Sequence, residues 1–142
     1  MTKVLATGTF DVLHPGHLHY LSSSKEEGDH LTVIIAREEM LEHKDNLLIP
    51  EEQRREMVEA LEPVDEAVLG SRESIFEPLY DIEPDVVTLG HDQQYGVDEL
   101  EEDLRERGLN AEVVRIEKRP ESGDEILSSS SIIEKAKQRD RR

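Results

Sequence analysis

Five short apolar runs, separated by segments with helix signals, constrain the fold of this chain more than any other feature. The runs are continuous rather than alternating, which is typical of strands buried on both faces of a parallel sheet. They are Val4–Thr7, Thr32–Ala36, Ala67–Leu69, Val86–Leu89 and Val113–Ile116. This rhythm in 142 residues predicts one α/β domain, residues 1–142, with an open five-stranded parallel sheet and helices on both faces.

The segments between these runs carry the residues with which helices begin and end. Pro15 opens the first segment and Gly28 follows it, as expected for the two ends of a helix. Helices are predicted over His17–Glu27, from Ile49 onward, over Ser71–Tyr80 with an interruption at Pro78, over Asp98–Arg107, and after the serine cluster Ser128–Ser131. Residues 42–49 and 117–127 are predicted to be long loops, which are often functional in so small a domain.

The charge of the chain excludes several classes of partner. Lys and Arg number 17 against 34 Asp and Glu, for a formal net charge of −17. Nucleic acids and anionic membrane surfaces instead favour basic patches, so we expect neither as a partner. The chain has no cysteine and therefore no thiolate metal site. No apolar stretch has the length of a signal peptide or membrane span, which predicts a cytoplasmic protein.

The excess of acid is itself informative. Charged residues make up 36% of the chain and aromatic residues 4%, a balance that disordered chains share. The recurring apolar runs nevertheless indicate a folded core. Self-repulsion on this scale is tolerated where salt screens it, so we interpret the chain as salt-adapted, or halophilic. An ordinary acidic protein is the alternative.

The segment after the first run has the parts of a phosphate-binding loop. It reads Gly8-Thr9-Phe10-Asp11-Val12-Leu13-His14-Pro15-Gly16-His17, which matches neither the fingerprint G-x-G-x-x-G nor the P-loop. Gly8 allows a sharp turn, after which Thr9 and Phe10 would expose backbone N–H groups. Gly16 allows an anion to approach the start of a helix. His14 and His17 are three residues apart, so both imidazoles can face one ligand.

The same two histidines suggest a metal site as an alternative, with His19 as a third imidazole. Zinc would need further ligands on the same face, and His19 should point away from His17. We therefore expect phosphate binding, and no metal site made by the protein alone.

Two motifs resemble a known family. Gly8-Thr9-Phe10-Asp11 followed by His14-Pro15-Gly16-His17 resembles the signature G-T-F-D-x-x-H-x-G-H of the cytidylyltransferase-like nucleotidyltransferases. The run Leu127-Ser128-Ser129-Ser130-Ser131-Ile132 is similar to the second motif of that family, I-S-[ST]-T-x-I, which also precedes a helix. The resemblance covers essentially the whole chain and implies a Rossmann-like domain of the HxGH type. It implies transfer of a nucleoside monophosphate from a nucleoside triphosphate to a phosphate-bearing acceptor.

The resemblance also implies roles for single residues. His14 and His17 would be catalytic and contact the triphosphate. The nucleotide would further be bound by Thr9, Phe10, Pro15 and Gly16. A divalent cation, most simply Mg²⁺, would accompany the triphosphate.

Asp11 in the motif, and basic residues in and just after the loop that follows the second apolar run, receive more open interpretations. Asp11 is interpreted as structural, orienting the loop. Lys44 is the candidate for a basic residue that binds the phosphates or the acceptor, with Arg54 and Arg55 near enough to contribute. A merely solvated Lys44 is an equal alternative.

The stretch after the fourth run bears on the acceptor. Leu89-Gly90-His91-Asp92-Gln93 resembles archaeal FAD synthases of the family, whereas lipid-precursor cytidylyltransferases usually have Gly-Asp-Asp there. Asp92 would lie beside the nucleotide and accept hydrogen bonds from it.

The serine motif also fits that subfamily. Ser129 and Ser130 are possible phosphate or acceptor contacts, although the run also suits a plain helix N-cap. Glycerol-3-phosphate cytidylyltransferases have an arginine four residues before the motif, where this chain has Gly123. Arg119 is the nearest substitute and is expected to bind the nucleotide; a solvated loop cation is the alternative.

Together these motifs predict transfer of AMP from ATP to the phosphate of FMN, giving FAD and pyrophosphate by direct in-line attack without a covalent enzyme intermediate. The alternatives are a CTP-dependent glycerol-3-phosphate cytidylyltransferase and a non-catalytic nucleotide-binding regulator. Relatives of this size are commonly dimers, so we expect a homodimer.

Overall fold

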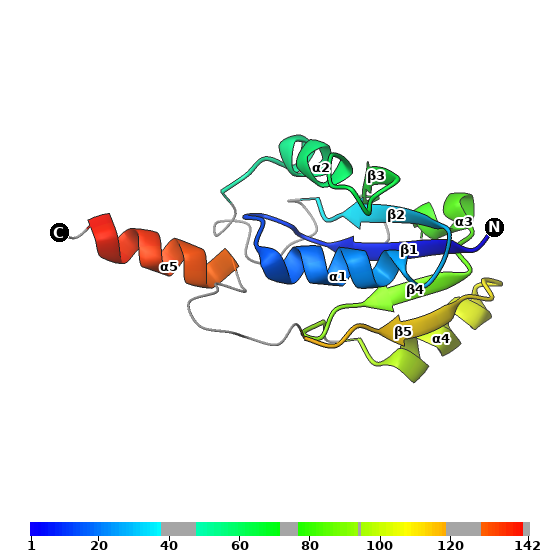
Figure 1. The fold of residues 1–142 in the computed structure, drawn as a ribbon. Helices are drawn as coiled ribbons and strands as arrows, with labels where there is room; N and C mark the ends of the chain where they lie inside the picture. The colour runs from blue at the N-terminus through cyan, green and yellow to red at the C-terminus, as the bar shows by residue number, and fades with distance from the viewer. Residues whose placement is uncertain (38–47, 72–76, 94, 119–128, 141–142) are drawn as a thin grey trace.

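Five parallel strands form one sheet in a computed structural model of the chain, which describes residues 1–37, 48–71, 77–93, 95–118 and 129–140 (Figure 1). The order of strands across the sheet is β3-β2-β1-β4-β5. Their bounds are β1 Lys3–Gly8, β2 His30–Ile35, β3 Glu66–Leu69, β4 Val86–Leu89 and β5 Glu112–Arg115. Each predicted apolar run thus lies in a strand, to within two residues at either end.

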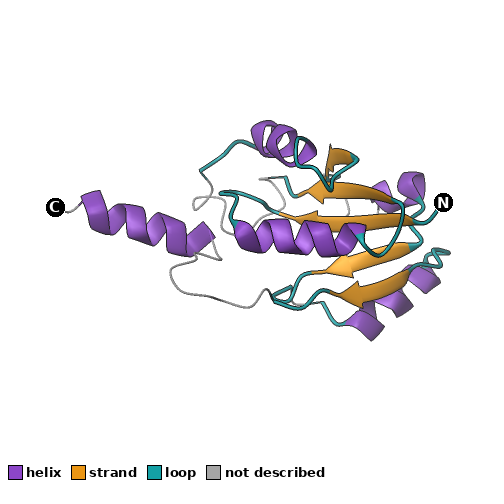
Figure 2. Ribbon diagram, in the orientation of Figure 1, coloured by secondary structure: helices purple, strands orange, loops and turns teal. Residues whose placement is uncertain are grey.

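Helices cover both faces of this sheet, as the strand–helix rhythm predicts (Figure 2). Helices α1 and α2 pack on one face, and α3 and α4 pack on the other. Their bounds are α1 Pro15–Lys25, α2 Glu51–Glu59, α3 Glu77–Ile82 and α4 Val97–Glu106, and the last helix is α5 Ser129–Asp140.

The core has two halves, one on each face. Alternate side chains of β1 point to opposite faces, so Val4 and Ala6 pack with Leu21 of α1 and Val58 of α2. Leu5 instead joins a second cluster on the other face, with Leu79 of α3 and Leu100 and Leu104 of α4. β1 is therefore packed on both faces of the sheet.

The strand order reverses at β1, which has β2 on one side and β4 on the other. Pairing with β2 continues to Gly8 opposite Ile35, but pairing with β4 ends at Ala6 opposite Thr88. The two strands therefore separate at their carboxyl ends. In open α/β sheets such a switch point is where ligands bind.

Within the described residues, the third predicted helix ends two residues later than expected, and Pro78 does not interrupt it. The sequence favours residues 71–80 with a break at Pro78, but α3 runs over Glu77–Ile82, with Pro78 as its second residue. Residues 72–76 lie outside the described part of the chain. Pro78 itself lies in helical backbone.

None of the acidic side chains that the structure describes is buried. Among the described residues, the buried polar or charged ones are Ser24, Thr32, Arg54 and Thr88, and none is a carboxylate. In the same part of the chain, no helix is both long and apolar enough to cross a bilayer.

This distribution predicts a strong dependence of stability on salt. The formal net charge of −17 sits on a small surface, and its self-repulsion weakens when the Debye length falls to about 3 Å in 1 M salt. We expect the protein to lose structure at low ionic strength and to regain it in molar KCl. Thermal melts followed by circular dichroism measure this, and equal melting temperatures in dilute buffer and 1 M KCl would contradict the salt-adapted interpretation.

Candidate active site

The loop between β1 and α1 is shaped by the packing of Phe10. This side chain is buried, and its backbone has a φ of 51°, in the left-handed region that residues other than glycine rarely adopt. Its ring lies 5.2 Å from that of His17 and covers Gly8, where a Cβ would come within 2.6 Å of the ring. Gly8 is thus required by this close approach. Backbone strain of this kind, held by a packed side chain, is common at functional sites.

The two motif histidines form the N-terminal cap of α1. The Gly16 N–H donates to Nδ1 of His14 (3.0 Å), and the His14 N–H donates to Nδ1 of His17 (3.3 Å). The imidazoles stack with their centroids 3.8 Å apart. A ring nitrogen that accepts a hydrogen bond carries no proton, so each neutral ring carries its proton on Nε2. The cap therefore presents two N–H donors side by side at a helix N-terminus, an arrangement suited to an anion.

Both rings are held in the neutral form. The pKa of His17 is lowered from 6.5 to about 4, mainly by burial and to a lesser degree by repulsion from His14, while Asp92 acts in the opposite direction. Burial also lowers the pKa of His14, again against Asp92. Asp92 thus interacts electrostatically with both histidines. The site thus has two neutral donors and one nearby carboxylate.

The loop between β1 and α1 is held in place by Asp11 and Arg54. The Asp11 carboxylate accepts hydrogen bonds from the backbone N–H groups of Leu48 and Ile49, at 3.1 and 2.8 Å, which supports its interpretation as structural. Arg54, only 1% exposed, donates to the carbonyls of Thr9 (2.7 Å), Ala36 (2.9 Å) and Ile49 (2.9 Å). It joins the ends of β1 and β2 to the start of α2.

These contacts correct the interpretation of both arginines of α2 as possible phosphate ligands. Arg54 is occupied by backbone carbonyls inside the protein. Arg55 bonds to Glu52, Glu59 and the Ala67 carbonyl, on the side of β3.

The loop after β4 is held by Arg115, at the end of β5. Its guanidinium donates to the carbonyls of Gly90 (2.7 Å), Gln93 (3.0 Å) and Tyr95. Three bonds from one rigid, always charged group fix the path of the backbone. This loop carries Asp92, so Arg115 sets where that carboxylate stands relative to the histidines.

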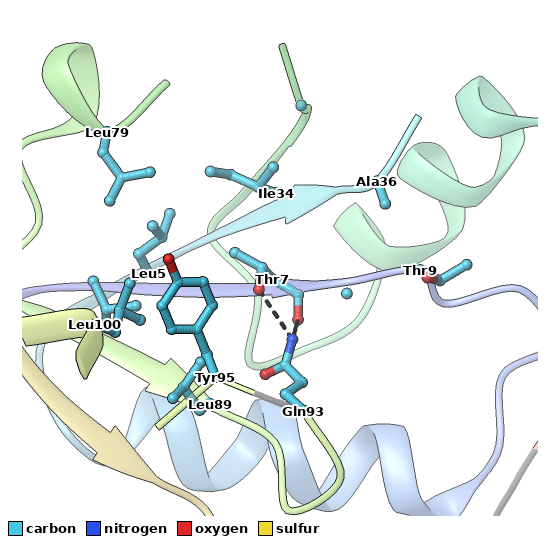
Figure 3. A pocket seen from close by; sticks show the side chains of 13 residues that line it. Leu5, Thr7, Thr9, Ile34, Ala36, Leu79, Leu89, Gln93, Tyr95 and Leu100 are labelled. Carbon is cyan, nitrogen blue, oxygen red and sulfur yellow. Dashed lines mark hydrogen bonds between the residues drawn. The ribbon is translucent and has the colours of Figure 1, made fainter. Parts of the chain in front are cut away.

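An apolar cavity of about 380 Å³ opens beside this loop, on the face of the sheet that α3 and α4 cover (Figure 3). Thr7, Gly8 and Thr9 bound it on the β1 side, and Tyr95 and Gln93 bound it on the β4 side. The rest of its lining consists mainly of aliphatic side chains of the sheet and helices, among them Leu5, Ile34, Leu79, Leu89 and Leu100. A pocket of this size and lining is typical of sites for small organic molecules.

Comparison with known proteins decides the family. Residues 5–136 match the cytidylyltransferase-like family. The chain belongs to this family. Its relatives include a protein named FAD synthase from Halomicrobium mukohataei, 57% identical over 93% of this chain and 92% of that protein. Another FAD synthase, from Ferroglobus placidus, is 54% identical over 95% of this chain and 88% of its own length.

Solved structures agree with the fold of this family. A lipopolysaccharide core biosynthesis protein from Thermoplasma volcanium has a TM-score of 0.81 and 36% identity, over 84% of this chain and 99% of its own. Pantothenate synthetase from Thermus thermophilus has a TM-score of 0.59 at 15% identity, over 84% of this chain and 56% of its own, and supports the fold alone.

The structure brings most of the predicted site residues of this nucleotidyltransferase together. Thr9, Phe10, His14, Pro15, Gly16 and His17 lie in the β1–α1 loop and the first turn of α1, and Asp92 acts on both histidines across the switch point. Lys44 and Arg119 lie outside the described residues, as do the side chains of Ser129 and Ser130 in the first turn of α5. Among the described residues, no cluster of three or more histidines and carboxylates could hold a metal ion.

Sequence reasoning missed the residues that hold the site in shape. Tyr20, Gln93 and Arg115 make hydrogen bonds to the backbone at the switch point. The sequence did contain a signal for Arg115, which is a charged residue within an apolar run. A half-buried charge needs a hydrogen-bond partner, so a structural role could have been predicted for it. Nothing in the sequence distinguished Tyr20 from an ordinary core residue of α1.

The neutral state of His17 leads to a prediction about its titration. The free protein should bind a proton at His17 only near pH 4, whereas the unfolded chain binds one near pH 6.5. Neutral His17 therefore makes its full contribution to the free energy of unfolding above pH 6.5, and this contribution is lost as the pH falls toward 4. A bound triphosphate favours the charged imidazole, so ATP should raise the pKa of His17. An NMR titration of the imidazole resonances with and without ATP measures both values, and an unchanged pKa on binding would contradict the contact.

Proposed function

We propose that the chain transfers AMP from ATP to the terminal phosphate of FMN, forming FAD and releasing pyrophosphate. The names of the relatives support this acceptor, since proteins 57% and 54% identical to the chain are FAD synthases. The observation that carries the proposal is the apolar cavity next to the phosphate-binding loop.

The cavity favours FMN over a small polar acceptor. The isoalloxazine of FMN is a large planar ring system, and its transfer from water into an apolar pocket is favourable. Aliphatic side chains and one aromatic ring line the cavity. Glycerol 3-phosphate has no apolar part to fill it. We place the flavin ring in the cavity and the FMN phosphate at its Thr9 end, facing the histidine cap.

The chemistry needs no nucleophile from the protein, because an FMN phosphate oxygen attacks the α-phosphorus of ATP directly. The enzyme has to align the two substrates and stabilise charge on the phosphate oxygens. The Nε2–H groups of His14 and His17 would donate to these oxygens. Because both rings are preorganised by backbone hydrogen bonds, they need not reorganise as the charge develops.

A divalent cation, which we take to be Mg²⁺, fits this donor set. Mg²⁺ prefers phosphate oxygens, water and one or two carboxylates. Asp11 is occupied by backbone N–H groups, so Asp92 is the nearby carboxylate that would join the phosphates around the ion. The cation would neutralise part of the triphosphate charge.

The remaining assignments extend this proposal. We keep Asp92 and Arg119 as nucleotide contacts, Lys44, Ser129 and Ser130 as contacts of the phosphates or the acceptor, and the homodimer as the assembly. The alternative of a regulator without catalysis is disfavoured by the paired donors of His14 and His17, which a plain binding protein would not need.

The experiment is a two-by-two comparison of substrates. The protein is incubated in high salt with FMN or glycerol 3-phosphate, and with ATP or CTP, and the products are separated by chromatography. We expect FAD from FMN and ATP as the main product. CDP-glycerol formation without any turnover of FMN would reverse the assignment, and no product in any arm would favour the regulator.

A further inference from the structure

The hydrogen-bond ladder between β1 and β4 stops one rung before the site. The last paired residues are Ala6 and Thr88, and the next pair in the same register would be Thr7 and Leu89. The Gly8 carbonyl faces β2, where it accepts from Ala36, so the polar groups of Thr7 face β4. In a continued parallel ladder the Thr7 N–H would donate to the Thr88 carbonyl, and the Gly90 N–H would donate to the Thr7 carbonyl.

A tyrosine hydroxyl takes the place of the first of these bonds. The Thr7 N–H donates to the Tyr20 hydroxyl (3.3 Å), which in turn donates to the Thr88 carbonyl (2.9 Å). The Thr88 hydroxyl also donates to Tyr20 (3.3 Å) and lies 2.7 Å from the Ser24 hydroxyl. Burial raises the pKa of Tyr20 to about 12, so the hydroxyl keeps the proton that it donates.

A glutamine amide takes the place of the second bond. The Gly90 N–H donates to Oε1 of Gln93 (2.6 Å), and Nε2 of Gln93 lies within hydrogen-bond distance of the Thr7 carbonyl (3.4 Å) and hydroxyl (3.2 Å) (Figure 3). A side-chain amide offers an acceptor oxygen and a donor nitrogen on one planar group. Neither a carboxylate nor an apolar side chain could bridge the two strands.

We propose that Tyr20 and Gln93 are positioning residues, which hold β1 and β4 apart at the switch point and so set the distance between the histidine cap and the loop that carries Asp92. We call them the Tyr20–Gln93 bridge. Neighbouring strands normally lie about 4.8 Å apart, and inserting a side-chain group between donor and acceptor widens that gap. Through the bridge, the backbone groups of Thr7, Thr88 and Gly90 keep hydrogen-bond partners where the two strands separate.

The two members act from opposite faces of the sheet. Tyr20 comes from α1 and packs against the core cluster under that helix. Gln93 lies on the loop after β4 and lines the apolar cavity on the other face, as Thr7 does. The position of the cavity relative to the phosphate-binding loop therefore depends on the bridge. This consequence for catalysis rests on the proposed function, whereas the hydrogen bonds do not.

The test combines amide hydrogen exchange with kinetics on Gln93→Leu and Tyr20→Phe. Gln93→Leu removes the acceptor of the Gly90 N–H, and Tyr20→Phe removes that of the Thr7 N–H. We expect exchange of the corresponding amide, followed by NMR, to speed up at least about tenfold in each variant. We also expect kcat/KM for FMN to fall by about tenfold to a hundredfold, because a small misplacement of reacting groups costs that much.

Matched controls separate these effects from general destabilisation. Gln53→Leu changes an exposed glutamine of α2, and Tyr80→Phe changes an exposed tyrosine of α3. Both should keep wild-type exchange at Thr7 and Gly90 and wild-type kinetics. Unchanged exchange in Gln93→Leu and Tyr20→Phe would overturn the bridge, and faster exchange with unchanged kcat/KM would overturn its positioning role. Failure of the wild type to make FAD would instead refute the proposed function, since the exchange measurement needs no acceptor.

Discussion

Replacing either histidine of the cap with alanine should lower the rate of FAD formation by about a hundredfold or more. Removing one preorganised donor to a developing oxyanion typically costs on the order of 3 kcal/mol, which corresponds to that factor. His14 and His17 each provide one Nε2–H donor, because their Nδ1 atoms already accept backbone N–H groups. Steady-state kinetics with ATP and FMN measure the loss.

Two further variants separate the donor from the helix cap. The amide oxygen of His17→Asn can replace Nδ1 as the acceptor of the His14 N–H, but its short side chain has no group at the Nε2 position. We expect it to fold and to be as slow as His17→Ala. His17→Gln reaches the Nε2 position and should recover part of the rate. His30→Ala, at the opposite end of the sheet, should keep full activity. Wild-type rates in a folded His17→Asn enzyme would exclude the phosphate contact.

Replacing Arg54 with methionine should cost at least about 3 kcal/mol of stability and should also impair activity. The variant leaves the carbonyls of Thr9, Ala36 and Ile49 without their donor inside the protein, and each unsatisfied buried acceptor costs about 1 to 3 kcal/mol. For a domain of this size the melting temperature should fall by roughly 10 °C. Thermal melts in high salt measure the change.

Arg55→Met is the matched control for this variant. It alters the neighbouring residue, whose ion pairs with Glu52 and Glu59 lie at the surface and contribute little. The melting temperature should therefore shift far less than in Arg54→Met. Equal shifts in the two variants would show that the buried hydrogen bonds of Arg54 do not stabilise the loop.

The strands and the cap were readable from the sequence because their signals are local. Val86–Leu89 and its counterparts are continuous apolar runs between helix signals, and the sheet follows from that rhythm. The spacing of His14 and His17 placed both rings on one turn of α1, and the structure stacks them. The interpretation of Asp11 as a structural residue that orients the loop is supported by its bonds to the backbone N–H groups of Leu48 and Ile49.

The remaining parts of the site depend on contacts between residues far apart in the chain. Tyr20 meets Thr88, and Arg115 meets Gly90, only after the strands have aligned in their register. Arg54 is a candidate phosphate ligand on sequence grounds because it is cationic and follows closely on the loop that contains Lys44. Its burial behind Thr9 is decided by the packing of α2 against β2 and β3, which no local pattern encodes.

The central claim is that AMP passes directly from ATP to FMN within this site. The most direct test uses one diastereomer of ATP that carries sulfur in place of a non-bridging oxygen on the α-phosphorus, with FMN as the acceptor. A single in-line displacement inverts the configuration at that phosphorus, so we expect a sulfur-labelled FAD of inverted configuration by ³¹P NMR. Retained configuration would indicate a covalent adenylyl-enzyme, and the absence of any sulfur-labelled flavin dinucleotide would contradict FMN as the acceptor.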